Sequence, residues 1–397
     1  MDSLGKYIKG DRYLWAFIGL LAVFSFLPIY SASTNLVVVH GSSTVFHYLF
    51  KHALFLAVGF IILFFTQFID YKYFGGLAVL AMPLVFVLLV ATLIQGQTEE
   101  GASAARWLRV PIINVLFQTS TAATMVLLIY CARYLAKNKD KPISFMESFW
   151  PLLVPVFITI ALIFPANGST AVILFILVLI LLFLGNYPFR YLLLMLLIGV
   201  FAAGVFIFVA LKLRDKIPSN RVHTWKGRVE RFMDKNAEES YQVKRAKTAI
   251  VLGGQFGRGP GKSALKASLP QSSSDFIYAI IVEEYGAVGG IILLFIYVMI
   301  FLRVLIIATK VDRYFGSLLV LAMGLPIVSQ ALINMGVAVN LLPVTGQTLP
   351  LISAGGTSIW ISCFGLGVIL SVSRTIQKDD PFMLETENIK ENEEKIA

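Results

Sequence analysis

Charged residues are scarce in this chain of 397 residues: only 14% are Asp, Glu, Lys or Arg, whereas 57% are hydrophobic. A soluble domain carries about 25% charged residues. The deficit therefore excludes an ordinary soluble globule, a disordered chain and a secreted disulfide scaffold. Uninterrupted apolar runs approach or reach the ~20 residues that a spanning helix needs, without the alternation typical of barrel strands. We therefore predict an all-α polytopic membrane protein.

Cysteine and histidine are also rare. The two cysteines, Cys131 and Cys363, both lie within apolar runs, where a thiol packs as a small hydrophobic group. No disulfide framework follows from them. The four histidines share no ligand spacing, such as i and i+4, with a nearby acid. This pattern argues against zinc chemistry and against a metalloprotease.

Ten apolar segments are long enough to be candidate transmembrane helices. The fifth and sixth are separated only by a Pro, Gly and Asn cluster at 165–169, which predicts a tight turn, with one broken helix as the alternative. The ten segments are 14–31, 48–69, 74–94, 112–135, 149–164, 170–184, 191–211, 276–300, 314–337 and 349–372.

Lysine and arginine are distributed unevenly over the short loops. They are concentrated in the N-terminal tail and after the fourth and eighth spans, whereas the opposite short loops hold almost only Arg106 and Arg109. The positive-inside rule then places both termini in the cytoplasm. We favour a retained first helix over a cleaved signal peptide, because nine more spans follow. The membrane domain is predicted to cover 1–376, and the acidic tail 377–397 is predicted to be disordered in the cytoplasm.

One large loop, 212–275, separates spans seven and eight, and this topology places it outside the cytoplasm. Basic residues outnumber acidic ones in it, which long translocated segments allow. The excess charge suggests an anionic partner, with anionic lipid head groups as the alternative.

Ionisable residues are nearly absent from the spans, apart from Glu283 and Glu284 in span eight. At 1.5 Å per helical residue, they lie about 12 to 13 Å from Asp275 at the loop boundary. The polar residues therefore gather at the outer face, which argues against an ion-coupled transporter and for chemistry on a substrate whose tail lies in lipid. A midplane site built from broken helices stays open. For the two glutamates, we favour burial against hydroxyl or cationic partners over direct catalysis.

Three segments contain motifs that could form a site. The glycine-rich stretch 253–263 has Phe256 where a nucleotide P-loop needs glycine, so ATP binding is excluded, and a phosphate-binding loop or a membrane re-entry turn remains. Ser272 to Asp275 open a helix, and Asp275 is either an N-cap, a catalytic acid or base, or both. Two prolines and several glycines in 342–358 predict irregular backbone that lines a cavity.

These motifs resemble the SEDS family (shape, elongation, division and sporulation), whose members polymerise glycan strands of peptidoglycan from lipid II. The resemblance covers nearly the whole chain, and 345–358 is more similar to the cell-division members than to the elongation members. It implies a bacterial cytoplasmic-membrane enzyme with lipid II, a class B penicillin-binding transpeptidase and other division proteins as partners, and no nucleic acid. The matching segments are 30–33, 106–108, 253–261, 275–286 and 343–358.

The resemblance also implies roles for individual residues. Asp275 matches the family's essential aspartate and is the predicted general base of an inverting displacement of polyprenyl diphosphate that forms a β-1,4 linkage. Cationic side chains would stabilise the leaving diphosphate, and a divalent cation, Mg²⁺ or Mn²⁺, is compatible with this role although no metal ligand is identified. The predicted substrate-binding residues are Arg106, Arg109, Lys262, Lys266, Glu283, Glu284, Ser353, Thr357 and Ser358.

Three positions depart from the family pattern. Thr121, Thr124 and Asn167 stand where the family has an acid, a lysine and an aspartate. A mechanism that needs those three charges is therefore not available to this chain. Two other functions stay open: a lipid II flippase or other lipid transporter, and a catalytically weak scaffold that recruits the transpeptidase.

Overall fold

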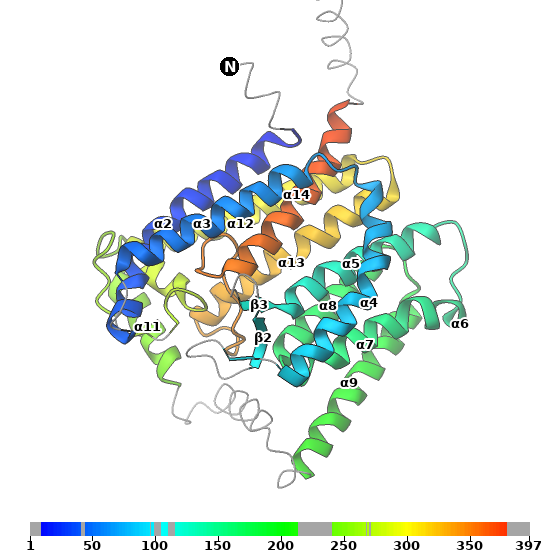
Figure 1. Cartoon of the computed structure of the whole chain (residues 1–397), viewed down its shortest axis with the longest axis horizontal. Helices are drawn as coiled ribbons and strands as arrows, with labels where there is room; N and C mark the ends of the chain where they lie inside the picture. Colours follow the sequence, from blue (N-terminus) through cyan, green and yellow to red (C-terminus); the bar gives the residue numbers. More distant parts are fainter. Residues whose placement is uncertain are drawn as a thin grey trace, which may run out of the picture.

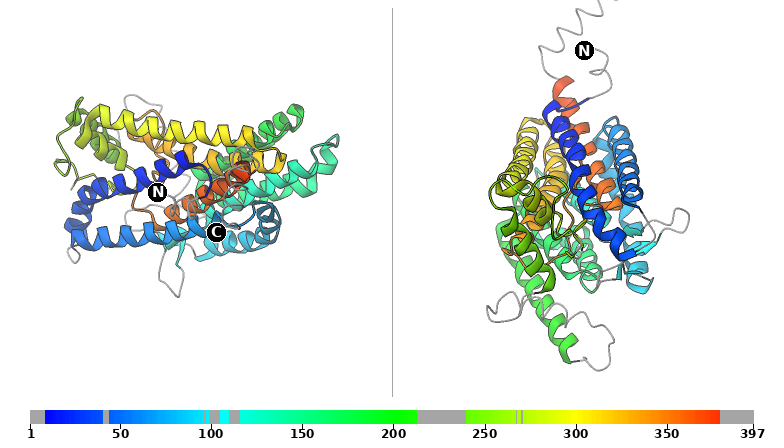
Figure 2. Two further views of the ribbon diagram at one scale, coloured as in Figure 1. Left: turned by 90° about the horizontal axis from the view of Figure 1, so that it is seen from above. Right: turned by 90° about the vertical axis from the view of Figure 1, so that its left-hand side faces the viewer.

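The computed structural model describes residues 9–40, 44–95, 97–98, 105–109, 116–212, 240–266, 268–269 and 271–378. Long helices run side by side in one bundle, with α9 extending from one end of it (Figures 1 and 2). The helices are α2 (Arg12–His40), α3 (Val45–Thr66), α4 (Lys72–Gln95), α5 (Thr119–Lys137), α6 (Phe145–Ser148), the π-helix η1 (Phe149–Leu153), α7 (Val154–Ile163), α8 (Gly168–Leu184), α9 (Phe189–Lys212), α11 (Tyr241–Gly253), α12 (Ile277–Lys310), α13 (Tyr314–Ala338) and α14 (Gly356–Lys378).

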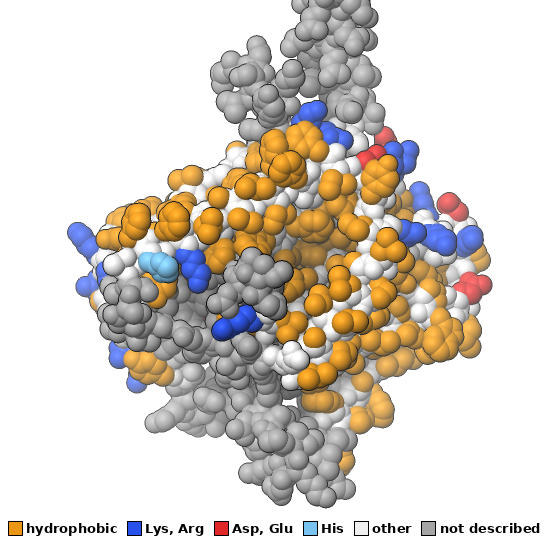
Figure 3. Space-filling model, viewed as in Figure 1, with side chains coloured by type: hydrophobic (Ala, Val, Ile, Leu, Met, Phe, Trp, Pro, Cys, Tyr) orange, Lys and Arg blue, Asp and Glu red, His pale blue; other side chains and the backbone are white. Residues whose placement is uncertain are grey.

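The helices have the length and composition of membrane spans. Within the described residues, nine helical segments of at least 18 residues are apolar enough to cross a membrane, and α8 is an apolar helix of 17 residues. Hydrophobic side chains cover most of the face shown in Figure 3, and lysines and arginines gather mainly towards its margins. The prediction of an all-α polytopic membrane protein is therefore confirmed, whereas the count of ten spans and the placement of 212–275 stay predictions.

Two predicted spans begin later than their hydropathy indicates. The fourth helix starts at Thr119 because 116–118 forms a strand, and the last helix starts at Gly356 instead of residue 349. In the second case the backbone leaves the helical region at Leu351, where φ is +65°. Hydropathy indicates that a segment is apolar but does not indicate which backbone conformation it adopts. It therefore predicts helix for 116–118 and for 349–355, which are not helical in the structure.

A small antiparallel sheet, which the sequence did not indicate, connects α4 to α5. Its strands are β1 (Gln97–Thr98), β2 (Ala105–Arg109) and β3 (Leu116–Gln118), in the order β1-β2-β3. In the β2–β3 pair, Trp107 lies opposite Gln118. The sheet packs against the ends of α4 and α5.

The fifth and sixth spans are two separate helices, as predicted. α6, η1 and α7 stack into a single span. The wider π turn contains Pro151, and Pro155 follows it in the first turn of α7; neither proline has the N–H that an α-helical ladder needs. The chain then turns, and Asn167 caps α8 by accepting a bond from the N–H of Thr170 at 3.4 Å.

Both described ends of the chain meet at the same end of the bundle. The backbone N–H of Asp11 donates to Ser373 Oγ at 3.0 Å, and Arg303 Nε lies 3.8 Å from Asp11 Oδ1. An even number of spans predicts this arrangement. α13 lies at the centre, in contact with α12, α5 and α14.

Candidate active site

Asp275 lies in the turn that precedes α12, and only 7% of its surface is exposed. The N-cap of α12 is Phe276, which makes no side-chain capping bond. The assigned helix therefore begins one residue later than an N-cap role for Asp275 requires.

Three consecutive carbonyl groups hold the backbone of this turn in place. The carbonyl of Ser273 accepts from the N–H of Ala354 at 2.8 Å, and that of Ser274 accepts from Ser353 Oγ at 2.7 Å. The carbonyl of Asp275 accepts from Asn334 Nδ2 at 2.9 Å. Buried backbone groups that are all bonded resist local opening. The backbone that carries Asp275 is therefore fixed by residues far along the chain.

Two amide side chains of α13, one helical turn apart, connect the same region. Asn334 Nδ2 also donates to the carbonyl of Gln347 at 2.7 Å, and Gln330 Nε2 donates to the carbonyl of Thr348 at 2.9 Å. Residues four apart lie on the same face of a helix. Neither amide is among the predicted site residues, although a spacing of four in an otherwise apolar helix is a usable signal.

The predicted binding residues of 353–358 lie in this same cluster. Ser353 Oγ accepts from the N–H of Leu349 at 2.7 Å while it donates to Ser274. Ser358 Oγ lies 2.8 Å from Thr348 Oγ1, and Thr357 is 2% exposed. The backbone of 342–355 is irregular, as the prolines and glycines predicted, and residues 343–355 are partly to fully buried. A role of the three hydroxyl groups in substrate binding stays a prediction.

Glu283 and Glu284 form a second cluster and are fully buried. Ser31 of α2 donates its hydroxyl to Glu284 Oε1, and Ser263 donates its hydroxyl to Glu283 Oε2. This confirms the expectation of burial against hydroxyl partners. Both carboxylates also accept hydrogen bonds from backbone N–H groups. Glu283 Oε1 accepts from Ala264 at 2.7 Å and from Leu265 at 3.4 Å, and Glu284 Oε1 accepts from Ser263 at 3.3 Å.

The glycine-rich segment packs on a break in α12. Gly286 has φ +71°, which interrupts the helical ladder directly after the two glutamates. A Cβ on Gly257 would lie 2.2 Å from the carbonyl oxygen of Glu284, and one on Gly253 would lie 2.1 Å from that of Val282. Four hydrogen bonds to the glycine-rich segment replace those that the break removes from the helix. The N–H of Arg258 donates to the carbonyl of Glu283 at 3.0 Å, and that of Gly259 donates to Glu284 at 2.9 Å. In the other direction, the N–H of Ala287 donates to the carbonyl of Gly254 at 2.9 Å, and that of Val288 donates to Gln255 at 3.2 Å.

This packing bears on the glycine-rich segment and on the two glutamates. Gly253 and Gly257 are required by close approach to α12 and not by a phosphate, because the space beside them holds protein backbone. Glu283 and Glu284 lie in the part of α12 between Ile277 and the break at Gly286.

The four predicted cations lie on two segments: Lys262 and Lys266 follow α11, and Arg106 and Arg109 belong to β2. Lys266 Nζ donates to the carbonyl of Gly261 at 2.8 Å, and Lys262 is exposed on the same segment. Arg109 is exposed on β2, and the side chain of Arg106 lies outside the described residues. Their binding of substrate stays a prediction.

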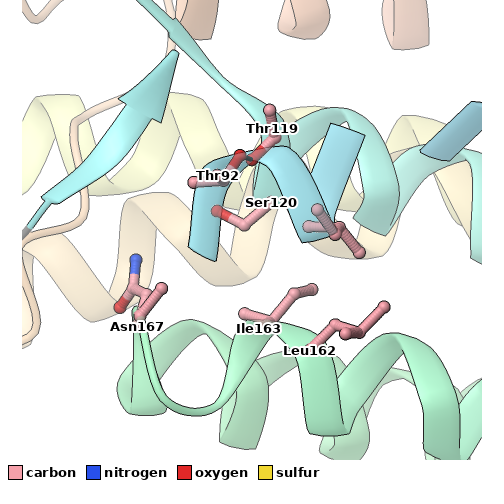
Figure 4. A pocket seen from close by; sticks show the side chains of 8 residues that line it. Thr92, Thr119, Ser120, Leu162, Ile163 and Asn167 are labelled. Atoms are coloured by element: carbon pink, nitrogen blue, oxygen red, sulfur yellow. Dashed lines mark hydrogen bonds between the residues drawn. The ribbon is translucent and has the colours of Figure 1, made fainter. Parts of the chain in front are cut away.

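A neutral pocket lies beside Asn167, one of the three positions at which this chain lacks a family charge (Figure 4). Asn167, 5% exposed, lies on one side of it, and the hydroxyl groups of Thr92, Thr119 and Ser120 lie on the other. Thr124 Oγ1 bonds the carbonyl of Ser120 in its own helix at 2.9 Å. The remaining lining is apolar and comes from Leu89, Leu162, Ile163 and Ala166.

Hydrogen bonds connect this pocket to Asp275. Gln347 Nε2 donates to Thr170 Oγ1 at 2.8 Å, and the N–H of Thr170 donates to Asn167 Oδ1. The carbonyl of Gln347 and that of Asp275 accept from the same nitrogen of Asn334. The pocket and the aspartate therefore belong to one polar network at one end of the bundle.

Metal ligands do not gather in the described residues: no three His, Cys, Asp or Glu side chains lie close enough to hold an ion. The divalent cation that the resemblance allows therefore stays a prediction.

Comparison with known proteins identifies the family. The chain matches the family of cell cycle proteins represented by FtsW, RodA and SpoVE over residues 11–378. A probable peptidoglycan glycosyltransferase FtsW of Saccharophagus degradans is 30% identical to it, covering 95% of this chain and 96% of its own. The stage V sporulation protein E of Bacillus subtilis is 28% identical, covering 93% and 98%.

Solved structures share the fold. A chain of a peptidoglycan synthase complex superposes with a TM-score of 0.72 at 23% identity, covering 93% of this chain and 99% of its own. The rod shape determining protein RodA of Thermus thermophilus superposes with a TM-score of 0.65 at 23% identity, covering 93% and 98%. The chain therefore belongs to the FtsW, RodA and SpoVE family of cell cycle proteins, the SEDS family that its sequence motifs resemble.

Proposed function

We propose that this protein is a peptidoglycan glycosyltransferase that polymerises lipid II into β-1,4 glycan strands during cell division. Its curated relatives are named probable peptidoglycan glycosyltransferases FtsW. One observation carries the proposal: a buried aspartate, Asp275, whose backbone is fixed by bonds from Asn334, Ser353 and Ala354. A carboxylate on a backbone that is held in this way suits proton transfer in a defined geometry.

In the proposed reaction, Asp275 accepts the proton of the acceptor sugar's hydroxyl group. The hydroxyl oxygen then forms a bond to the anomeric carbon of the donor as the bond from that carbon to the diphosphate oxygen breaks. The α-linked donor becomes a β-linked product in this single displacement. Diphosphate leaves as an anion and needs no proton, so one carboxylate suffices where a glycosidase uses two.

Cationic side chains would stabilise the leaving diphosphate. Lys262 and Lys266 are held on the segment that Glu283 and Glu284 attach to α12 through Ser263. We propose that these buried glutamates act on the reaction by placing the cationic segment. Arg106 and Arg109, on the strand between α4 and α5, are the other candidates.

The proposed setting is the outer face of the bacterial cytoplasmic membrane, with both termini in the cytoplasm. The structural neighbour from a peptidoglycan synthase complex supports a penicillin-binding transpeptidase as partner. We extend this to a class B enzyme, lipid II as the substrate, and further division proteins. A scaffold role is the second candidate, favoured by the neutral residues Thr121, Thr124 and Asn167.

Glycan polymerisation by the purified protein tests the proposal. Wild type and Asp275→Asn are compared on lipid II, with and without the transpeptidase, at equal amounts of folded protein. We expect product from wild type and a loss of at least about 100-fold in Asp275→Asn, since general-base catalysis contributes ~10²–10⁴-fold. Equal product from both would remove Asp275 from the mechanism. No product from either in the presence of the partner would favour the scaffold, or a lipid II transporter if wild type moves lipid II across vesicles.

A further inference from the structure

Large apolar side chains are exposed where α11 ends and the glycine-rich segment begins. Val251 is 77% exposed, Leu252 42% and Phe256 81%, whereas another face of α11 is buried and packs on α12. We call these three residues the apex. Exposed apolar patches of this kind mark contact with a membrane or with another protein.

Two helices place the glycine-rich segment near a membrane boundary. The N–H of Ala287 on α12 donates to this segment, and Tyr30 of α2 lies 3.8 Å from the Cβ position of Gly261. Near the other end of these helices, the guanidinium carbon of Arg303 lies 3.8 Å from the centre of the Tyr13 ring. A helix rises ~1.5 Å per residue, so Ala287 lies about 24 Å from Arg303 along α12, and Tyr30 about 26 Å from Tyr13 along α2.

Both distances approach the ~30 Å thickness of the hydrocarbon core. The segment therefore lies near the boundary opposite the end of the bundle where the described chain ends meet, and Figure 1 shows α11 at that opposite end. The break at Gly286 makes Ala287 the start of this span. Tyr278 Oη lies 2.8 Å from the Cβ position of Gly290, whereas a straight helix would separate these residues by about 18 Å. The part of α12 before the break is therefore folded back beside the part after it.

The backbone of the segment is bonded within the protein, which a position in contact with lipid requires. Besides the four bonds to the break in α12, the N–H of Gly257 donates to the carbonyl of Gly253 at 2.8 Å, and that of Lys262 donates to Gly259 at 3.1 Å. A loop in water does not need such pairing, because water satisfies its polar groups. The irregular backbone is thus compatible with the membrane boundary.

Positive charge accompanies the apex. Residues 241–266 include six basic residues and no acidic residue. Arg258, two residues after Phe256, and Lys262 are both exposed. Apolar side chains beside lysines and arginines are typical of segments that lie in the interface of anionic membranes. The position and the charge together favour an anionic lipid surface over a protein as the partner of the apex.

We propose that the apex inserts into the outer leaflet of the membrane, and that Arg258 pairs with the phosphate of an anionic phospholipid beside it. The outer leaflet is the one that the proposed topology assigns to this end of the bundle. The apex then continues the exposed apolar surface of α12, where Val288 is 45% and Ile291 64% exposed. This part of the large loop is an element of the membrane surface and not a loop in water.

Insertion of the apex also sets the level of Lys262. This lysine lies on the same segment, and its N–H is bonded to Gly259. Its ammonium group is then held at the level of the lipid phosphates, which is also the level of the diphosphate of a membrane-anchored substrate. This consequence rests on the proposed function, whereas the insertion itself does not.

Spin labels test the insertion directly. Phe256→Cys is labelled in the full-length protein, in vesicles of phosphatidylcholine and phosphatidylglycerol, and its collisions with O₂ and with a water-soluble nickel chelate are compared. Ile291→Cys is the control in lipid, and Asp140→Cys, exposed in the turn after α5, is the control in water. Both native cysteines are fully buried, and the unsubstituted protein gives the background.

Because O₂ dissolves in hydrocarbon and the chelate does not, we expect the O₂-to-nickel ratio at Phe256 to be several-fold above that at Asp140. Val251→Cys provides a second position if Phe256→Cys does not fold. Ratios at the apex equal to that at Asp140 would overturn the inference. So would protection from nickel that appears only when the transpeptidase is added, because a protein would then be the occupant.

Crosslinking tests the lipid that Arg258 selects. Phe256→p-benzoylphenylalanine reacts on illumination with C–H bonds of a neighbouring molecule, and mass spectrometry identifies the adduct. In vesicles with equal amounts of the two phospholipids, we expect about fivefold more adduct with phosphatidylglycerol, the contribution of one basic residue at an anionic surface. Arg258→Ala should bring the two adducts close to equality, whereas Arg190→Ala, exposed at the start of α9, should keep the preference. Equal adducts without any change at Arg258 would refute the pairing, and adducts mainly with added lipid II would make the apex a substrate site instead.

Polymerisation tests the level of Lys262 separately. In the same vesicles, Phe256→Ser should raise KM for lipid II about 10-fold with kcat within threefold, and Phe256→Leu should keep the KM of wild type. An unchanged KM in Phe256→Ser would refute this consequence. Insertion measured by the spin labels supports the anchor even if wild type polymerises nothing. Normal polymerisation without insertion refutes the anchor and leaves the polymerase standing.

Discussion

Asn334 Nδ2, on a side chain that is 1% exposed, bonds the carbonyl oxygen of Asp275 at 2.9 Å across 59 residues of sequence. The same nitrogen bonds the carbonyl of Gln347 at 2.7 Å. One amide group therefore joins the start of α12, the end of α13 and the irregular segment before α14. It fixes the position of the proposed base relative to the segment that leads to the neutral pocket.

Replacing Asn334 should affect the rate of the reaction more than the binding of substrate. Asn334→Ala leaves two buried carbonyl groups without this donor and releases Asp275. We expect kcat for glycan polymerisation to fall by about 100-fold with KM within threefold of wild type, since a displacement of about 1 Å costs roughly this factor. The measurement is steady-state kinetics on lipid II.

Gln330→Ala is the matched control, because Gln330 lies one turn away on α13 and bonds Thr348 and Ser358 but not Asp275. It should lower thermal stability by a similar amount and keep kcat within a few-fold of wild type. A kcat loss as large in Gln330→Ala as in Asn334→Ala would show that general loosening of the segment, and not the position of Asp275, limits the rate.

The glycine at 257 should tolerate no side chain. Gly257 has φ +80°, and a Cβ there would lie 2.2 Å from the carbonyl oxygen of Glu284. Gly254 has φ +55° but nothing within 4 Å of its Cβ position, so it isolates the backbone strain from the clash. Gly254 has ψ −144°, outside the left-handed helical region, so we expect Gly254→Ala to cost about 1 to 3 kcal/mol and Gly257→Ala clearly more. Thermal unfolding of the two variants in detergent compares them, and equal melting temperatures would contradict the close approach.

The carboxylate of Glu283 should hold the segment that carries Lys262 and Lys266. Glu283→Ala removes the acceptor of the N–H of Ala264 and the hydroxyl of Ser263, and each unpaired buried donor costs about 1 to 3 kcal/mol. We expect trypsin to cleave after Lys262 and Lys266 several-fold faster than in wild type. Glu284→Gln is the control. The glutamine keeps one side-chain oxygen as an acceptor at the position of Oε1, and its NH₂ group replaces Oε2, which accepts no hydrogen bond from the protein. Equal cleavage in Glu283→Ala and wild type would show that the segment is held elsewhere.

The sequence predicts the spans well because an apolar run of this length has few alternatives to a helix in lipid. It also singles out Asp275 and the paired glutamates, since charged residues are rare near the spans. It does not predict the bond from Asn334 to Asp275, because a contact across 59 residues leaves no local pattern. Nor does it predict the break at Gly286, since a glycine in an apolar run is compatible with a continuous helix.

The cationic side chains provide the last test, because the resemblance assigns them to the diphosphate. Lys262 is exposed and its ammonium group is free to reach a ligand, whereas Lys266 Nζ already bonds Gly261. We therefore expect Lys262→Ala to raise KM for lipid II about 10-fold, and Lys262→Arg to restore it, since a desolvated ion pair with diphosphate contributes more than an exposed one. Lys244→Ala, at an exposed position of α11, is the control and should leave KM unchanged. If alanine at Arg106, Arg109, Lys262 and Lys266, each changed singly, leaves polymerisation untouched, the diphosphate must be stabilised by other groups.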